Sequence, residues 1–238
     1  MLLYYIKELK NRLILVISSW LINVLISYYY KETLFFYTIK YLSSEPLYFI
    51  TTNITEIITS YLSLSYFNAT LFTFGLIFYH FLSFVSPSLY IYEFITAKNY
   101  ILITIFSLLL STLSLNCYII PYFWNFFLSF QDYNSVINFY FEGKLNEYIE
   151  FYIKSYIYFF LLSQLLITIF FFSSKIKNFP LAVKKYRKIM YLFFLILATI
   201  FTPPDVFSQL LIFLLSQVFY ELLTFFLIYS EIINLEAN

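Results

Sequence analysis

Hydrophobic residues occur along this chain in long runs that are separated by short polar stretches. A helix that crosses a bilayer needs roughly 20 largely apolar residues to cover about 30 Å of hydrocarbon. Four runs have about this length, and Pro203 and Pro204 divide the apolar stretch after Lys188 into two further runs. We therefore predict an all-α, polytopic integral membrane protein with six transmembrane helices. The predicted spans cover about residues 13–30, 66–85, 100–124, 151–172, 189–201 and 206–228.

The fifth predicted span is short. Its roughly 13 residues reach only about 20 Å at about 1.5 Å per residue, so the bilayer must thin there or neighbouring protein must support the helix. The residues that follow have the pattern of a helix start: a hydroxyl cap at Thr202, prolines in the first turn, and a carboxylate at Asp205. This pattern predicts a tight turn and the start of the sixth helix.

The distribution of charge predicts the orientation in the membrane, because basic residues prefer the side from which a membrane protein is inserted. Residues 1–12 carry three basic residues and one acid, and residues 175–188 carry six basic residues and no acid. Residues 132–150 carry four acids and one lysine, so they belong on the opposite side. With six spans, both termini lie on the insertion side, which is the matrix, the stroma or the cytoplasm.

The composition agrees with lipid as the solvent. Of the 238 residues, 62% are hydrophobic and 11% are charged, which is more apolar surface than a soluble domain of this size can bury. No repeat or Pro-, Gly- or Ser-rich linker divides the chain, so we expect a single transmembrane domain over residues 1–238. A net charge of +1 gives no reason to expect a nucleic acid as a partner.

The sequence has few residues that could hold a cofactor. The single cysteine, Cys117, and the single histidine, His80, cannot form an internal disulfide, a metal cluster or paired axial haem ligands. Within the predicted spans there are no paired carboxylates, no Ser with His, and no HExxH spacing. We therefore expect no metal, no cofactor and no enzymatic activity.

Three segments carry distinctive motifs: residues 201–209 (FTPPDVFSQ), 5–13 (YIKELKNRL) and 84–93 (FVSPSLYIYE). They resemble signature segments of the TatC family, the receptor subunits of the twin-arginine protein export system. Residues 201–209 (FTPPDVFSQ) are similar to the segment between the family's last two spans. Residues 5–13 (YIKELKNRL) are similar to its amino-terminal pattern, with Lys10 in place of an arginine. Residues 84–93 (FVSPSLYIYE) resemble the family's Pro-any-Leu-Tyr-any-any-Glu element after the second span.

This resemblance implies a function without catalysis. TatC proteins bind the twin-arginine signal peptides of folded cargo on the insertion side. They then assemble with single-span TatA- or TatB-type partners, and the proton-motive force drives transport. The resemblance implies the same partners here, with more than one copy of the chain in a larger complex within the lipid bilayer.

The resemblance and the predicted topology together indicate a signal-peptide site at Glu8 and Glu93, with Lys10 and Arg12 beside them. Carboxylates bind guanidinium groups in bidentate geometry, and in a partly desolvated site each charged contact is worth about 1.5–3 kcal/mol. The alternative is that Glu8 pairs with Lys10 or Arg12 in solvent and Glu93 with Lys98. Such exposed pairs are worth less than about 1 kcal/mol each.

Three further polar residues match family positions along the path of the partner or cargo: Gln164, Asp205 and Glu221. Gln164 lies among leucines in the fourth span, where its amide needs a polar partner on another helix or on a substrate. Asp205 is explained better as a helix cap than as a contact for a partner. Glu221 is a candidate partner contact, although it also lies near enough to the interface to reach water.

A hydrophobic structural or proton-conducting subunit of a respiratory complex is the alternative function. Such a subunit should carry Lys, Glu or His in the middle of several spans, whereas the first three predicted spans are nearly free of charge. The excess of Phe, Tyr, Ile, Leu and Asn over Ala, Gly and Arg is typical of an AT-rich organelle genome. We therefore expect the mitochondrial inner membrane, with a plastid thylakoid or a bacterial plasma membrane as alternatives, and no cleavable presequence.

Overall fold

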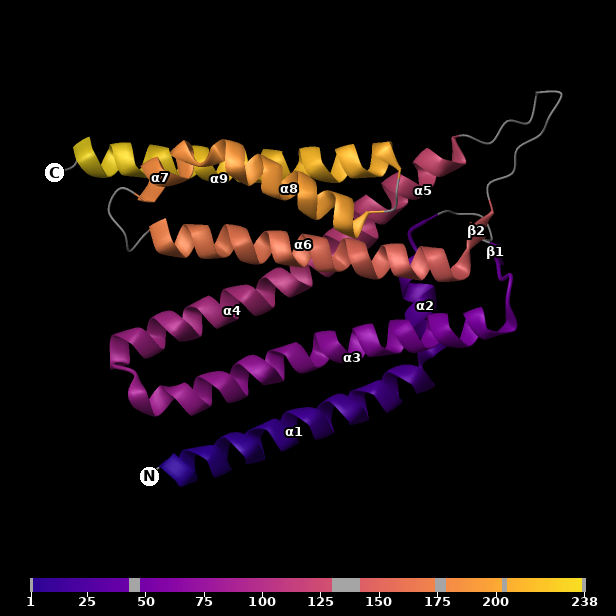
Figure 1. Cartoon of the computed structure of the whole chain (residues 1–238), viewed down its shortest axis with the longest axis horizontal. Coiled ribbons are helices and arrows are strands. Elements are labelled where there is room, and N and C mark those ends of the chain that lie inside the picture. Colours follow the sequence, from indigo (N-terminus) through magenta and orange to yellow (C-terminus); the bar gives the residue numbers. More distant parts are fainter. Residues whose placement is uncertain (1, 43–47, 130–141, 174–178, 203–204, 237–238) are drawn as a thin grey trace. The chain divides into compact units, whose positions relative to one another are not determined.

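The computed structural model describes residues 2–42, 48–129, 142–173, 179–202 and 205–236, and this part of the chain is almost entirely helical (Figure 1). The predicted all-α fold class is therefore confirmed. The helices are α1 (Leu2–Tyr29), α2 (Lys31–Ile39), α3 (Ile54–Val85), α4 (Ile91–Ser114), α5 (Ile120–Leu128), α6 (Leu145–Ser173), α7 (Phe179–Lys185), α8 (Arg187–Phe201) and α9 (Val206–Glu236).

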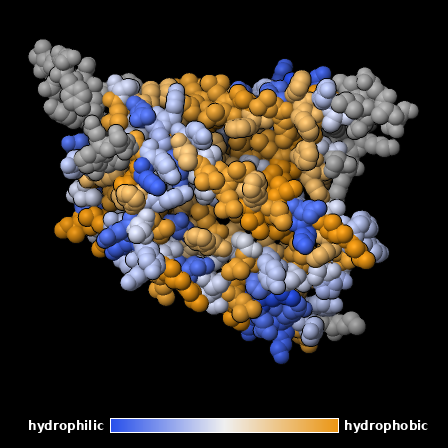
Figure 2. All heavy atoms as spheres, turned by 180° about the vertical axis from the view of Figure 1, so that it is seen from behind, coloured by the Kyte–Doolittle hydropathy of each residue, from blue (hydrophilic) through white to orange (hydrophobic). Residues whose placement is uncertain are grey.

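Five helical segments of the described chain are long and apolar enough to cross a membrane: 3–29, 54–88, 91–128, 145–173 and 206–230. The fifth predicted span lies on α8, which has 15 residues and reaches about 22 Å, so this span is as short as its sequence suggests. Large apolar side chains are widely exposed, and Leu25 of α1 is 72% exposed. Figure 2 shows such side chains over much of one face, as expected for a surface that faces lipid.

Several helices extend beyond the predicted spans because polar residues continue them outside the apolar run. The second span was predicted to begin near residue 66, whereas α3 begins at Ile54. The carboxylate of Glu56 accepts hydrogen bonds from the backbone nitrogen of Thr52 at 2.9 Å and from the side-chain amide of Asn53 at 3.1 Å. These contacts hold the chain at the start of the helix.

The third predicted span, residues 100–124, is not one regular helix. A π-helical turn, η2 (Leu115–Ile119), separates α4 from α5. Pro121 lies just after this turn and has no amide hydrogen to donate to the preceding turn, which interrupts the regular hydrogen-bond pattern. The side chain of Asn116 within the turn is buried, 2% exposed.

The chain forms two compact units, which are described separately. The first comprises residues 1–105 and 113–153, and the second comprises residues 106–112 and 154–238. Each unit therefore combines distant parts of the sequence, and both α4 and α6 contribute residues to each of them.

In the first unit, α1 lies along α3, and a short connection, η1 (Ser86–Ser88), leads from α3 into α4 (Figure 1). At the other end, strand β1 (Phe49–Ile50) pairs in parallel with strand β2 (Gly143–Lys144). Gly143 allows this pairing, because a Cβ at this position would lie 3.0 Å from the ring of Trp124. The hydroxyl of Tyr148 donates to the carbonyl of Thr38 at 2.9 Å and ties α6 to α2 there.

In the second unit, α7 and α8 pack against α9. One face of α9 is buried at intervals of four residues, and small polar side chains alternate there with large ones. Small residues let two helices approach closely, which replaces the glycine-based packing that this sequence lacks. The buried residues of this face are Ser208, Ile212, Ser216, Tyr220 and Thr224.

Candidate functional site

Glu8 lies in the first turns of α1 and forms an ion pair with Arg12, one helical turn further along. Oε1 of Glu8 accepts hydrogen bonds from Nε of Arg12 at 3.0 Å and from Nη2 at 2.7 Å. Residues four apart face the same side of a helix, which brings these two groups together. Both side chains are partly buried, 30% and 27% exposed respectively. Of the two pairings considered for Glu8, the structure contains the one with Arg12.

Arg12 also contacts α3. Its Nη1 donates to the hydroxyl of Ser83, and that hydroxyl in turn donates to the backbone carbonyl of His80 at 3.3 Å. The guanidinium is therefore held between a carboxylate of its own helix and a hydroxyl of the neighbouring helix. The sequence contains no signal for Ser83, because serine is common in the spans and its proximity depends on how α1 packs against α3.

Glu93 lies in the first turn of α4 and caps its own helix. Its Oε2 accepts a hydrogen bond from the backbone nitrogen of Tyr90 at 3.1 Å, and its Oε1 accepts one from the hydroxyl of Tyr92 at 3.2 Å. The ion pair with Lys98 that was considered as an alternative is not formed. Glu93 thus has hydrogen-bond donors around it but no cationic partner within the described part of the chain.

Glu8 and Glu93 lie at the same end of the first unit. The contact between Arg12 and Ser83 fixes the amino-terminal part of α1 beside the end of α3, and η1 then leads directly into the first turn of α4. Figure 1 shows the N-terminus and the α3–α4 connection at this end. Lys10 is exposed at the same end and has no ion pair among the described residues. Glu8 and Glu93 therefore lie at one end of the first unit. Glu8 is paired with an arginine, whereas Glu93 has no cationic partner among the described residues.

Gln164 in the second unit has the polar partner that its position requires. Its amide nitrogen donates to the hydroxyl of Ser107 on α4 at 2.8 Å. A few residues away on α6, the hydroxyl of Tyr156 donates to the carbonyl of Leu108 at 3.3 Å. These two bonds join α6 to the segment of α4 that belongs to the same unit, so Gln164 acts at least as a contact between helices.

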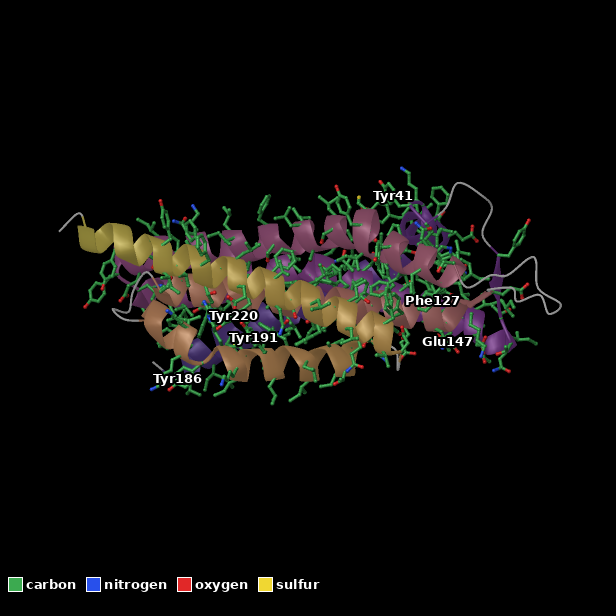
Figure 3. The ribbon with its side chains drawn as sticks, turned by 90° about the horizontal axis from the view of Figure 1, so that it is seen from above. Tyr41, Phe127, Glu147, Tyr186, Tyr191 and Tyr220 are labelled. Atoms are coloured by element: carbon green, nitrogen blue, oxygen red, sulfur yellow. The ribbon has the colours of Figure 1, made fainter. Side chains whose placement is uncertain are left out.

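Glu221 is part of a network that joins α8 to α9. Its Oε2 lies 3.3 Å from Nη1 of Arg187, and its Oε1 accepts a hydrogen bond from the hydroxyl of Tyr191. Nη2 of Arg187 also donates to the hydroxyl of Thr224 at 3.3 Å. Figure 3 shows Tyr191 near Tyr220, and their rings are 6.2 Å apart. Both carboxylate oxygens of Glu221 therefore have partners within the chain.

Asp205 caps α9. Its Oδ2 accepts a hydrogen bond from the backbone nitrogen of Ser208 at 3.3 Å. Thr202, which the sequence suggested as the hydroxyl cap, instead closes α8, and its hydroxyl donates to the carbonyl of Ala198 at 2.8 Å. The cap is thus Asp205, because the chain leaves α8 only after Thr202 and begins α9 at Val206. Pro203 and Pro204 lie outside the described residues.

Within the described residues, no group of three or more His, Cys, Asp or Glu side chains is arranged to hold a metal ion.

Comparison with known proteins adds independent evidence. The family model described as Sec-independent protein translocase protein (TatC) matches residues 4–214. The chain is 31% identical over 227 residues to the uncharacterized tatC-like protein ymf16 of Nephroselmis olivacea, with 93% of this chain and 92% of that protein covered. It is 28% identical over 216 residues to the Sec-independent protein translocase protein TatC of Rickettsia prowazekii, with 86% and 83% covered.

Among solved structures, the fold is similar to a crystal structure of the twin-arginine translocase receptor TatC in the detergent DDM. The TM-score is 0.74 at 24% sequence identity, and the match covers 93% of this chain and 98% of that one. The match of a family model to nearly the whole chain, together with the related sequences, shows that this multi-pass membrane protein belongs to the TatC family.

Proposed function

We propose that this protein is the receptor subunit of a twin-arginine translocase and binds the twin-arginine signal peptides of folded proteins without catalysing a reaction. Membership of the TatC family supports this function. Glu8 and Glu93 lie at one end of the first unit, each on a different helix, and this position supports the assignment of the function to these two residues. Such a pair of carboxylates is suited to binding two adjacent arginines.

The two carboxylates differ in how they would receive an arginine. Glu93 has no cation beside it among the described residues, and each of its oxygens still has a lone pair beyond the bonds from Tyr90 and Tyr92. Glu8 already binds Arg12 through Oε1. Each new charge-assisted contact in a partly desolvated site is worth about 1.5–3 kcal/mol. Lys10 and Arg12 belong to the same proposed site and contribute its positive charges.

This end of the first unit would face the side from which the protein is inserted, where signal peptides arrive. The excess of basic residues in the amino-terminal segment supports that orientation. Six spans would then place both termini on the matrix, stromal or cytoplasmic side. The organelle-like composition favours the mitochondrial inner membrane as the location.

TatA- or TatB-type single-span proteins are the proposed partners, in a complex that contains more than one copy of this chain. Gln164 remains the best candidate of the three residues predicted along the partner or cargo path. Its bond to Ser107 uses the amide nitrogen, and the amide oxygen can accept a bond from a passing helix. For Asp205 and Glu221, the cap and the α8–α9 network already provide structural roles.

Photocrosslinking of a signal peptide to the full-length protein in membrane vesicles tests this function. We expect efficient crosslinking of a twin-arginine peptide and weak crosslinking of the same peptide with two lysines. Glu8→Gln and Glu93→Gln should each reduce crosslinking by about tenfold or more, the loss expected for one charged contact. Glutamine keeps the acceptor oxygen that caps α4, so Glu93→Gln removes charge with little change in structure.

Glu147→Gln is the matched control. Glu147 is an exposed carboxylate in the first turn of α6 and pairs with Lys144 at 3.3 Å. This turn follows β2, at the opposite end of the first unit from the α3–α4 connection (Figure 1). Its replacement should leave crosslinking unchanged. Crosslinking that is equal in the wild type, Glu8→Gln and Glu93→Gln would refute the proposed receptor site.

A further inference from the structure

The junction between α7 and α8 carries three lysines whose charges are not balanced by neighbouring acids. Lys184 and Lys185 lie in the last turn of α7, and Lys188 lies in the first turn of α8. All three are exposed, and none forms an ion pair among the described residues. Residues 175–188 contain no acid. A concentrated positive charge therefore remains on this surface of the second unit.

Arg187 lies among these lysines in the sequence but differs from them in its contacts. Its guanidinium belongs to the α8–α9 network, 3.3 Å from Oε2 of Glu221. One of the four basic residues is thus paired inside the protein, and the other three face outward. Helix dipoles explain only part of this arrangement. Cations are favourable at the carboxyl end of α7 but unfavourable in the first turn of α8, where Lys188 lies.

An exposed apolar face of α8 begins directly after Lys188. Ile189, Leu192 and Ile196 are exposed and follow one another at intervals of three and four residues, which places them on one side of the helix. Tyr186, where α7 meets α8, is also exposed (Figure 3). Tyrosine is favoured at the level of lipid headgroups. The surface therefore changes from cationic to aromatic to aliphatic, which matches the change from headgroup to acyl chain in a phospholipid.

We propose that the three lysines and the exposed face of α8 bind an anionic phospholipid of the leaflet on the insertion side. The ammonium groups hold the phosphate of the headgroup, as basic clusters beside membrane spans do, and the aliphatic side chains contact the acyl chains. Long side chains that flank a short span such as α8 extend toward the headgroups. A zwitterionic lipid has no net charge to balance the lysines, and a free phosphate ion would not use the apolar face. This proposal does not depend on the receptor function.

The three charges set the size of the expected effect. Each lysine near the membrane surface raises the affinity for an anionic lipid by about fivefold. The contributions of three neighbouring lysines therefore multiply to about 100-fold. An effect of this size is measurable for one lipid molecule on one protein.

Lipid binding to the full-length protein in a non-ionic detergent tests this proposal. Phosphatidylglycerol is titrated, and native mass spectrometry gives the apparent dissociation constant of the first bound molecule. We expect tighter binding than for phosphatidylcholine with the same acyl chains, and no displacement by an equal concentration of inorganic phosphate. Lys184→Gln, Lys185→Gln and Lys188→Gln should each weaken binding of phosphatidylglycerol by about fivefold, and the triple variant should weaken it by about 100-fold.

Two matched variants distinguish a local site from the total charge of the protein. Lys7→Gln, Lys40→Gln and Lys98→Gln together remove three positive charges from other exposed positions and should leave binding of phosphatidylglycerol nearly unchanged. Arginine at the three α7–α8 positions keeps the charge and should keep the affinity of the wild type. All of the replaced side chains are exposed, so the thermal midpoints of these variants should equal that of the wild type.

Several results would overturn the proposal. Equal affinities of the wild type and the α7–α8 glutamine triple would show that the lysines do not hold the lipid. Equal losses in the two glutamine triples would assign the effect to total charge. Displacement by inorganic phosphate would make this a site for a free anion. If the α7–α8 triple keeps its lipid but loses a co-purifying single-span protein, the surface is a protein interface instead.

Discussion

The described part of the protein contains two arginine–glutamate pairs of similar exposure but different construction. Arg12 and Glu8 lie on one helix, and Arg12 contacts a single oxygen of the carboxylate. Arg187 and Glu221 lie on α8 and α9, and both oxygens of Glu221 have partners. Oε2 of Glu8 has no hydrogen bond among the described residues, whereas both oxygens of Glu221 are bound by side chains of α8, so a further cation at Glu221 would compete with contacts between helices.

The pair of Arg187 and Glu221 helps to hold the short helix α8 in place. A helix of 15 residues has little apolar surface with which to hold its place, and Arg187 begins it at the end that carries Lys184, Lys185 and Lys188. The network to Glu221 fixes this end to α9. The bond from the hydroxyl of Tyr220 to the carbonyl of Val183, at 3.1 Å, attaches α7 to α9 beside it.

The largest expected effect on stability comes from Glu221→Gln. This change leaves Arg187 without its carboxylate, and Nε of Arg187 is already buried without a hydrogen-bond partner in the described part of the chain. We expect a loss of about 2 kcal/mol, because an unpaired and partly buried charge is costly. Thermal unfolding in detergent should show a midpoint lower by about 5 °C.

Glu147→Gln is the comparison for that measurement, since it removes an exposed pair with Lys144 and should change the midpoint by less than about 1 °C. Equal midpoints for the Glu221 and Glu147 variants would show that the α8–α9 network contributes nothing to stability. The distinction between the two arginine–glutamate pairs would then disappear.

A smaller effect is expected for Tyr191→Phe, which removes the hydroxyl that donates to Oε1 of Glu221. The loss should be about 1 kcal/mol, typical of one hydrogen bond to a charged group in a partly exposed site. Combining it with Glu221→Gln should cost less than the sum of the two single changes, because both act on one network. Strict additivity in this double-mutant cycle would show that Tyr191 and Glu221 do not interact.

The smallest effect on stability is expected for Glu8→Gln. The pair with Arg12 lies within one helix, and pairs at this spacing contribute about 0.3–0.5 kcal/mol. The thermal midpoint should therefore fall by no more than about 2 °C, although binding of the signal peptide is strongly reduced. A loss as large as that of Glu221→Gln would mean that the first pair is a structural clamp as well.

The difference between the two arginine–glutamate pairs also shows what could be predicted from the sequence. The six apolar runs coincide with helical segments because lipid requires helices that satisfy their own backbone hydrogen bonds. The pairing of Glu8 with Arg12 is readable from a spacing of four. The pairing of Arg187 with Glu221 is not, because no local pattern indicates which residues of α8 and α9 face each other.

Other features depended on packing that the sequence pattern does not encode. Helix α2 follows α1 without a proline or glycine between them, so no signal marked a new element at Lys31. The pairing of β1 with β2 joins residues far apart in the chain, so it depends on tertiary packing. The π-helical turn around Asn116 lies within an apolar run that predicts a regular helix.

We expect Glu8 to distinguish the arginines of a signal peptide from lysines on a scaffold that does not need this carboxylate for folding. Dissociation constants of matched twin-arginine and twin-lysine peptides should be measured for Glu8→Gln and the wild type at equal thermal stability. We predict that the preference for arginine in the wild type nearly vanishes in the variant. A variant that folds normally and keeps the wild-type preference would show that Glu8 does not have this role.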